Sequence, residues 1–205
     1  MVDNLRELGI KVVVVKGPKS IADVKENVKL IAKTLGEEDK GNLMIAKMDD
    51  KLAEIKEKVD NIKPEERKKL VLISLMTSYG GKGCTFDDIC QYAGVINGVS
   101  DAGLHNGQLL TKEMLVDINP DLLIMPVYND HNTFDIEKYN KEFLEDPALQ
   151  TLNAVKEKRF FYPREGYIYN SSQDIVFGVQ EVARAAYGEL FSQPENCHIS
   201  VAEIN

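Results

Sequence analysis

The sequence predicts an α/β protein with a Rossmann-like C-terminal lobe, in which helices cover a central, mostly parallel sheet. Short apolar runs at residues 69–76, 122–125 and 159–162 have the length of buried strands. They alternate with longer segments whose apolar residues recur every three or four positions, as in amphipathic helices. Because strands buried on both faces and separated by helices are typical of parallel sheets, this order favours that architecture.

The charge and the length of the apolar runs exclude some classes of function. The 205 residues carry a formal net charge of −8, which argues against binding to nucleic acid. No apolar run approaches the ~20 residues that a membrane-spanning helix needs. The first residues lack the apolar core of a secretory signal, so the chain as given is expected to carry no export address.

The N-terminal part is predicted to hold a helix end, a strand and a first full helix. Residues 4–9 have the pattern of a helix tail that ends at a glycine, and the β-branched run 11–15 predicts a strand. Ser20 can cap a helix that Gly36 ends. The apolar stripe expected on one face of this helix is Ile21, Val24, Val28, Ile31 and Leu35.

A second helix is predicted over residues 39–62. Its apolar stripe is Met48, Leu52, Ile55, Val59 and Ile62. The stripe is short and the other faces mix both charges, which favours a packed surface helix over a coiled coil or a membrane-surface helix. At ~1.5 Å per residue such a helix spans roughly 35 Å.

The segments that follow each predicted strand contain the chemistry-bearing residues. Residues 77–85 form a glycine-rich loop with Lys82, followed by a helix that Thr85 is expected to cap. Thr111 is expected to cap a helix that ends before Asn119. Loops at the carboxyl ends of parallel strands carry ligands in open sheets, which makes residues 127–133 a candidate ligand loop. A last helix is expected over residues 172–191, with Ile175, Val179, Val182, Ala183, Ala186 and Leu190 on its inner side.

Three sequence segments resemble a known family. They are Gln-Leu-Leu-Thr-Lys-Glu at 108–113, Asn-Pro-Asp-Leu-Leu-Ile at 119–124, and the run 146–159 with its Ala-Val-Lys. In this order and spacing they resemble the second lobe of the substrate-binding proteins that serve ABC importers of iron-siderophores, haem and cobalamin. The similarity extends from Leu5 to Phe191.

The resemblance implies a division of the chain. Residues 1–38 would be a remnant of an N-terminal lobe, 39–63 the long helix between two lobes, 64–192 the C-terminal α/β lobe, and 193–205 a tail. The leading strands of the family's first lobe have no counterpart, so the chain resembles a member truncated at its N-terminus. The family is periplasmic or held outside the cell by a membrane anchor; a cytoplasmic location is expected if this start is genuine.

The resemblance also implies the site residues and partners. Expected ligand-binding residues are Ser78, Tyr79, Lys82, His105, Asn106, Gly107, Tyr128, His131, Arg164, Tyr167 and Tyr169. The ligand would be an iron chelate or a tetrapyrrole, with arginine to neutralise its acidic oxygens and tyrosines to supply rings and hydroxyls. Glu113 would meet arginines of the ABC permease. No catalytic residue, cofactor or resident metal is expected.

Three alternatives stay open. A direct zinc or manganese binder would use His105, Asp130 and His131. An enzyme would use Cys84 or His131 as nucleophile or base, although no orienting acid stands at a suitable spacing. A half-module with exposed apolar surface would associate with a second copy as a homodimer.

Overall fold

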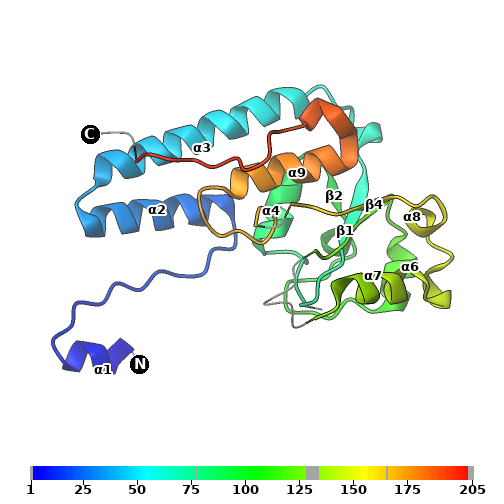
Figure 1. Ribbon diagram of the computed structural model, residues 1–205, viewed down its shortest axis with the longest axis horizontal. Coiled ribbons are helices and arrows are strands. Elements are labelled where there is room, and N and C mark those ends of the chain that lie inside the picture. The colour runs from blue at the N-terminus through cyan, green and yellow to red at the C-terminus, as the bar shows by residue number, and fades with distance from the viewer. Residues whose placement is uncertain (1, 77, 128–133, 165, 203–205) are drawn as a thin grey trace.

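The computed structural model describes residues 2–76, 78–127, 134–164 and 166–202. Helices and short strands alternate from residue 69 onward, as the sequence predicts (Figure 1). The elements in order are α1 (Val2–Glu7), α2 (Ile21–Leu35), α3 (Glu38–Val59), η1 (Pro64–Glu66), β1 (Lys69–Leu72), α4 (Thr85–Tyr92), β2 (Ile96–Asn97), α5 (Gly98–Asp101), α6 (Lys112–Ile118), β3 (Leu122–Ile124), α7 (Ile136–Leu144), η3 (Pro147–Leu149), α8 (Asn153–Lys156), β4 (Phe160–Phe161), α9 (Ile175–Tyr187) and η4 (Gly188–Phe191).

The strands form one parallel sheet in the order β2-β1-β3-β4. Leu70 of β1 pairs with Asn97 on one side and with Leu122 on the other. Alternate residues of a strand point to opposite faces. Leu70 and Leu72 therefore join a core with α3, α4 and α9, while Val71 and Ile73 join a second core with α5 to α8. Helices thus cover both faces of the sheet, which confirms the predicted α/β class.

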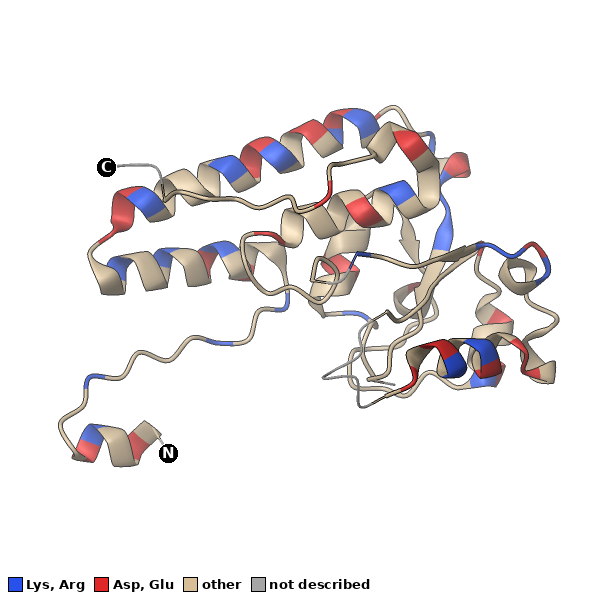
Figure 2. Ribbon diagram, in the orientation of Figure 1, with Lys and Arg blue, Asp and Glu red and all other residues tan. Residues whose placement is uncertain are grey.

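Helices α2 and α3 form an antiparallel pair that reaches beyond the sheet (Figure 1). The Ser20 hydroxyl accepts the Asp23 N–H at 3.1 Å, and Gly36 takes the left-handed conformation that ends α2. A Cβ on Gly41 would lie 2.4 Å from Cβ of Ala32, so the glycine permits the close approach of the two helices. The stripe of α3 from Met48 to Val59 is buried as predicted, and mixed charges band the rest of the helix (Figure 2).

The prediction of a strand at residues 11–15 is wrong. This segment is extended and leads away from the body toward α1 (Figure 1). No backbone hydrogen bond joins residues 11–15 to any other residue that the structure describes. A β-branched run needs a neighbouring strand to become part of a sheet, and this segment has none among the described residues.

The stripe predicted on α2 is buried only at its start. Ile21 and Val24 pack into the core, whereas Ile31 and Leu35 are exposed, Leu35 to 70%. The far end of α2 lies beyond the sheet and its covering helices, where it packs along α3 (Figure 1). The periodicity is that of an amphipathic helix and α3 packs along it, but Ile31 and Leu35 remain exposed.

Three smaller expectations also change. Thr85 is the first residue of α4, and the N-cap is Cys84, whose side chain makes no capping bond. Strand β1 ends at Leu72, because the Ser74 hydroxyl then accepts the Met76 N–H in a turn. Leu190 lies in the 3-10 turn η4 after α9 ends and is 58% exposed, rather than on the inner side of a continuing helix.

An ion-pair network closes the C-terminal end of the chain. Glu181 of α9 is fully buried and accepts hydrogen bonds from Arg164 Nε at 2.8 Å and from Gln193 Nε2 at 2.9 Å. Arg184 lies 3.3 Å from the same carboxylate. Burial opposes ionisation of Glu181, but the bonds from Gln193 and Arg164 and the two guanidinium charges outweigh it, so its pKa lies below the usual value. The network fixes the loop before α9 to the chain after it.

Candidate functional site

The loops that follow the strands meet at one edge of the sheet. All strands are parallel, so their carboxyl ends share this edge. The described parts of these loops are residues 73–76 and 78–84 after β1, 102–111 after β2 and α5, 125–127 and 134–135 after β3, and 162–164 and 166–174 after β4. We call them the rim. Strand β1 has β2 on one side and β3 on the other, which makes the β1/β3 boundary the topological switch point where open α/β sheets bind ligands.

Backbone hydrogen bonds join the first two rim loops. The Lys82 N–H donates to the Leu104 carbonyl at 2.9 Å, and the Asn106 N–H donates back to the Lys82 carbonyl at 3.0 Å. The Gly107 N–H donates to the Ser78 carbonyl at 2.7 Å. A Cβ on Gly81 would lie 2.7 Å from the carbonyl carbon of His105, so only glycine fits between the loops.

These contacts bring together five of the predicted ligand residues. Ser78, Lys82, His105, Asn106 and Gly107 all lie on the two joined loops and are exposed at their surface. Ser78 and Lys82 are close in sequence, as are the residues from His105 to Gly107. Only the fold brings the first loop against the second. Their role in binding stays a prediction.

Tyrosines link the first rim loop to the last. The rings of Tyr79 and Tyr169 have centroids 5.7 Å apart, and the Tyr79 hydroxyl bonds to that of Thr85 at 2.9 Å. Burial raises the pKa of Tyr79 to about 12, and it raises the pKa of Tyr169, against the effect of a hydrogen bond with Ser74. Both phenols are therefore protonated at neutral pH and act as neutral hydrogen-bonding rings.

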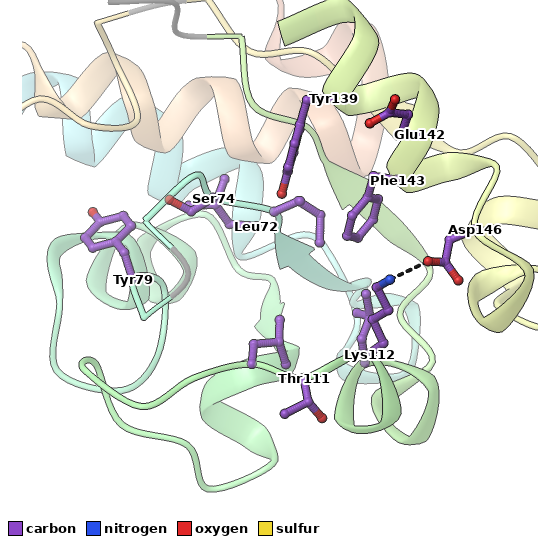
Figure 3. Close-up of a pocket in the computed structure, with 12 residues that line it drawn as sticks. Leu72, Ser74, Tyr79, Thr111, Lys112, Tyr139, Glu142, Phe143 and Asp146 are labelled. Atoms are coloured by element: carbon purple, nitrogen blue, oxygen red, sulfur yellow. Dashed lines mark hydrogen bonds and ion pairs between the residues drawn. The ribbon is translucent and has the colours of Figure 1, made fainter. Parts of the chain in front are cut away.

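A hollow opens beside this tyrosine pair at the β1/β3 switch point (Figure 3). We call it the rim hollow; its volume is about 390 Å³. It is lined by Leu72, Ile73, Ser74, Tyr79, Leu110, Thr111, Lys112, Leu115, Tyr139, Glu142, Phe143 and Asp146. Most of its wall is apolar, and an ion pair between Lys112 and Asp146 stands at one side (Figure 3). The hollow is of the size and polarity of a small-molecule pocket.

Two of the remaining predicted ligand residues, Arg164 and Tyr167, have side chains that bond within the protein. Arg164 is committed to Glu181 and to the carbonyls of Gln193 and Pro194. Tyr167 is buried, and its hydroxyl donates to the Cys197 carbonyl at 2.9 Å. Both side chains serve the packing of the C-terminal segment, and a role for them in ligand binding stays a prediction.

Tyr128 and His131 lie outside the described residues, as does Asp130 of the alternative metal site. Across the described parts of the chain, no three His, Cys, Asp or Glu side chains gather closely enough to hold a metal ion.

Glu113 occupies the first turn of α6 and is exposed. Its own backbone N–H and the Thr111 hydroxyl hydrogen-bond to the carboxylate and lower its pKa. Thr111 caps the same helix through the Met114 N–H at 3.3 Å, as predicted. The carboxylate is therefore ionised and fixed at a helix start, in a position suited to meet a cationic partner.

Sequence reasoning missed most residues of the rim hollow. Tyr139 and Phe143 are four positions apart on α7, a spacing that signals a shared helix face but not what the face covers. Ser74, Leu110 and Lys112 belong to other elements, and only the sheet order brings them to α7. No local pattern could have grouped them.

A parallel sheet covered by helices on both faces, with its loops meeting at one edge and a long helix joined to it, defines an α/β fold with its candidate site at that edge. The chain belongs to the periplasmic binding protein family, which its sequence matches over residues 2–165.

Individual proteins are similar to this chain over most of its length, one in sequence and two in fold. An uncharacterized ABC transporter substrate-binding lipoprotein of Bacillus subtilis (strain 168), YvrC, is 25% identical over 94% of this chain and 59% of its own length. The periplasmic heme-binding protein RhuT from Roseiflexus sp. RS-1 superposes with a TM-score of 0.76 at 18% identity, over 91% of this chain and 70% of that one. An ABC-type Fe3+-hydroxamate transport protein from Saccharomonospora viridis DSM 43017 gives 0.69 at 18% identity, over 91% and 64%. The chain spans about three fifths of the curated relative's length.

Proposed function

We propose that this chain contributes the C-terminal binding lobe and the long connecting helix of a solute-binding component of an ABC importer, and that its ligand is chelated iron or a tetrapyrrole. The observation that carries the proposal is the shared rim: loops from all the strands meet at one edge, with a hollow at the switch point. Relatives whose names specify heme or Fe3+-hydroxamate share this fold. The division into lobe remnant, helix, lobe and tail at residues 38, 63 and 192 is part of the proposal.

Binding without catalysis suits the chemistry of the rim. Cys84, the nucleophile of the enzyme alternative, is buried and donates its thiol to the Gly81 carbonyl at 3.2 Å. Burial raises its pKa, which disfavours the reactive thiolate. The rim instead offers neutral phenols, hydroxyls and backbone groups, which orient a ligand in a concave site.

The importer partner would meet the exposed carboxylate of Glu113, with permease arginines as the complementary groups. The lipoprotein relative supports a location at the outer side of a membrane. Within the described residues, no helix has both the length and the apolar character needed to cross a bilayer.

Ligand titration tests the proposal. A ferric siderophore, haem and cobalamin are added separately to the 205-residue chain, and absorbance and melting temperature are followed. One of them is expected to saturate. At a hundredfold excess over its Kd, linkage gives about 2.7 kcal/mol of stabilisation, a melting shift of roughly 5–10 °C.

A variant locates the binding site. Tyr169→Ala removes a rim ring and is expected to weaken binding about tenfold, on the scale of a lost aromatic contact. Tyr92→Ala removes an exposed tyrosine at the end of α4, outside the rim, and it should bind as the unmodified chain does. If none of the ligands saturates, the proposed function is wrong.

Self-association is a second candidate function, favoured by exposed apolar residues in the extended segment 11–15 and at the end of α2. Val14 is 53% exposed on the unpaired extended segment, and Leu35 is 70% exposed on α2. Residues 11–15 make no backbone hydrogen bond with other described residues, so a second copy can pair with this segment as a strand.

Light scattering after size-exclusion chromatography tests this second candidate. The unmodified chain is expected to form a dimer, and Val14→Asp with Leu35→Asp should convert it to a monomer, because the buried interface would then contain charges. Leu190→Asp, at an equally exposed leucine of η4, is the control and should remain dimeric. A chain that is monomeric up to high concentration contradicts the idea.

A further inference from the structure

We propose that the rim hollow accepts one uncharged aromatic ring, of the phenol type, and excludes rings that carry a carboxylate. The inference rests on the proposed function only in supposing that a larger ligand carries this ring. The hollow would accept such a ring by itself or as part of a larger chelate.

Apolar side chains form the base of the hollow. Leu72 at the end of β1 (Figure 3) and Leu115 of α6 are buried, and Leu110 of the second rim loop also lines the hollow. A cavity of about 150 Å³ lined by aliphatic and aromatic groups can hold benzene. The rim hollow has about 390 Å³ and opens to solvent, so one substituted ring fits with room for its attachment to a larger body.

Aromatic rings stand on two sides of the hollow. Tyr139 and Phe143 of α7 lie nearly parallel, with centroids 6.3 Å apart and planes at 27°. Tyr79 faces the same space from the first rim loop (Figure 3). A flat ring placed between them can make offset or edge-to-face contacts, which contribute about 0.5–1.5 kcal/mol per pair beyond the apolar area buried. The walls therefore favour an aromatic guest over an aliphatic one.

The Tyr139 hydroxyl is directed into the hollow (Figure 3) and makes no hydrogen bond with another described residue. Burial raises the pKa of Tyr139, against a smaller effect of the Lys112 charge, so the phenol keeps its proton. It can donate to or accept from a guest hydroxyl. This polar group sets the orientation of a ring that the apolar wall holds.

Charge at the side of the hollow opposes an acidic guest. Lys112 is paired with Asp146, and that hydrogen bond raises the pKa of Lys112 and lowers the pKa of Asp146. The ammonium charge is thus already neutralised. The exposed carboxylate of Glu142 stands nearby, with Lys138 of the same helix 3.8 Å away. A carboxylate guest would have to displace Asp146 or approach Glu142, and both cost free energy.

Binding of small probes to the full chain tests the inference. Phenol and benzoate are titrated separately, with saturation-transfer NMR and calorimetry as readouts. Phenol is expected to bind saturably with a millimolar Kd, and benzoate at least tenfold more weakly. Tyr139→Phe should weaken phenol roughly 2- to 12-fold, the effect of one net hydrogen bond. Tyr92→Phe makes the same change at an exposed tyrosine outside the hollow and should leave phenol binding unchanged.

A variant that removes the charge of Asp146 is expected to gain benzoate binding. Asp146→Asn keeps a side-chain oxygen for the Ala148 N–H but releases Lys112, so benzoate should then bind as tightly as phenol. Leu110→Trp fills the hollow and should abolish phenol binding while circular dichroism shows an unchanged fold.

Equal binding of phenol and benzoate to the unmodified chain, or phenol binding that Leu110→Trp leaves intact, overturns the inference. Chelate binding without phenol binding also overturns it and leaves the proposed function standing. Phenol binding without chelate binding supports it and contradicts the proposed function.

Discussion

Glu181→Gln is expected to destabilise the fold by about 3 kcal/mol. The substitution keeps the shape of the side chain but leaves Arg164 and Arg184 without their counter-charge, and removing one partner of a buried ion pair costs about 3–5 kcal/mol. The two arginine side chains are 25% and 28% exposed, so water screens part of the loss and the lower end applies. Urea unfolding measures the change.

The pH dependence of this effect has a defined sign. The pKa of Glu181 is lower in the folded chain than in the unfolded chain, where glutamate titrates near ~4.3. Its contribution is therefore fully present above that value and is lost as pH falls through the folded pKa. The stability difference between the unmodified chain and Glu181→Gln should shrink in acid.

The control for Glu181→Gln is the same change at the exposed Glu189, which should alter stability by less than about 0.5 kcal/mol at any pH. Equal stability of Glu181→Gln and the unmodified chain at neutral pH would show that the network does not hold the C-terminal segment.

Gly81→Val is expected to separate the first two rim loops. Its Cβ would stand 2.7 Å from the carbonyl carbon of His105 and 2.8 Å from the Leu104 carbonyl oxygen, both of them backbone atoms. The Lys82–Leu104 hydrogen bond would break as the loops move apart. Overpacking of this kind costs about 1–3 kcal/mol. The displaced loops should also weaken binding of any rim ligand more than tenfold, measured by the titrations above.

Gly17→Val is the matched control for the Gly81 variant. Nothing lies within 4 Å of a Cβ at Gly17, and its backbone does not require glycine. It should unfold and bind as the unmodified chain does. If Gly81→Val behaves in the same way, contact between the loops is not needed for the site.

Helix starts and ends were predictable because their causes are local. Ser20 and Thr111 each accept a backbone N–H three residues ahead, as their positions before an amphipathic run predict. The inward faces of α3 and α4 follow in the same way from residue spacing. Because all the strands are parallel, the meeting of their loops at one edge was also predictable; that a ligand binds there stays a prediction.

Partner choice was not predictable from local pattern. Arg164 is of a residue type that often binds acidic ligands. The fold instead pairs its side chain with Glu181, seventeen positions away in the chain. The rim hollow combines α7 with β1 and α6 only because β1 stands between β2 and β3.

The sequence by itself therefore determined the α/β class, the capped helices and the edge of the sheet where the candidate site lies, since these depend on contacts between near neighbours. Only the tertiary structure decided which side chains share the rim hollow, and that residues 11–15 have no strand beside them among the described residues. Strand pairing and side-chain partners depend on contacts distant in sequence, whose free energy no local pattern encodes.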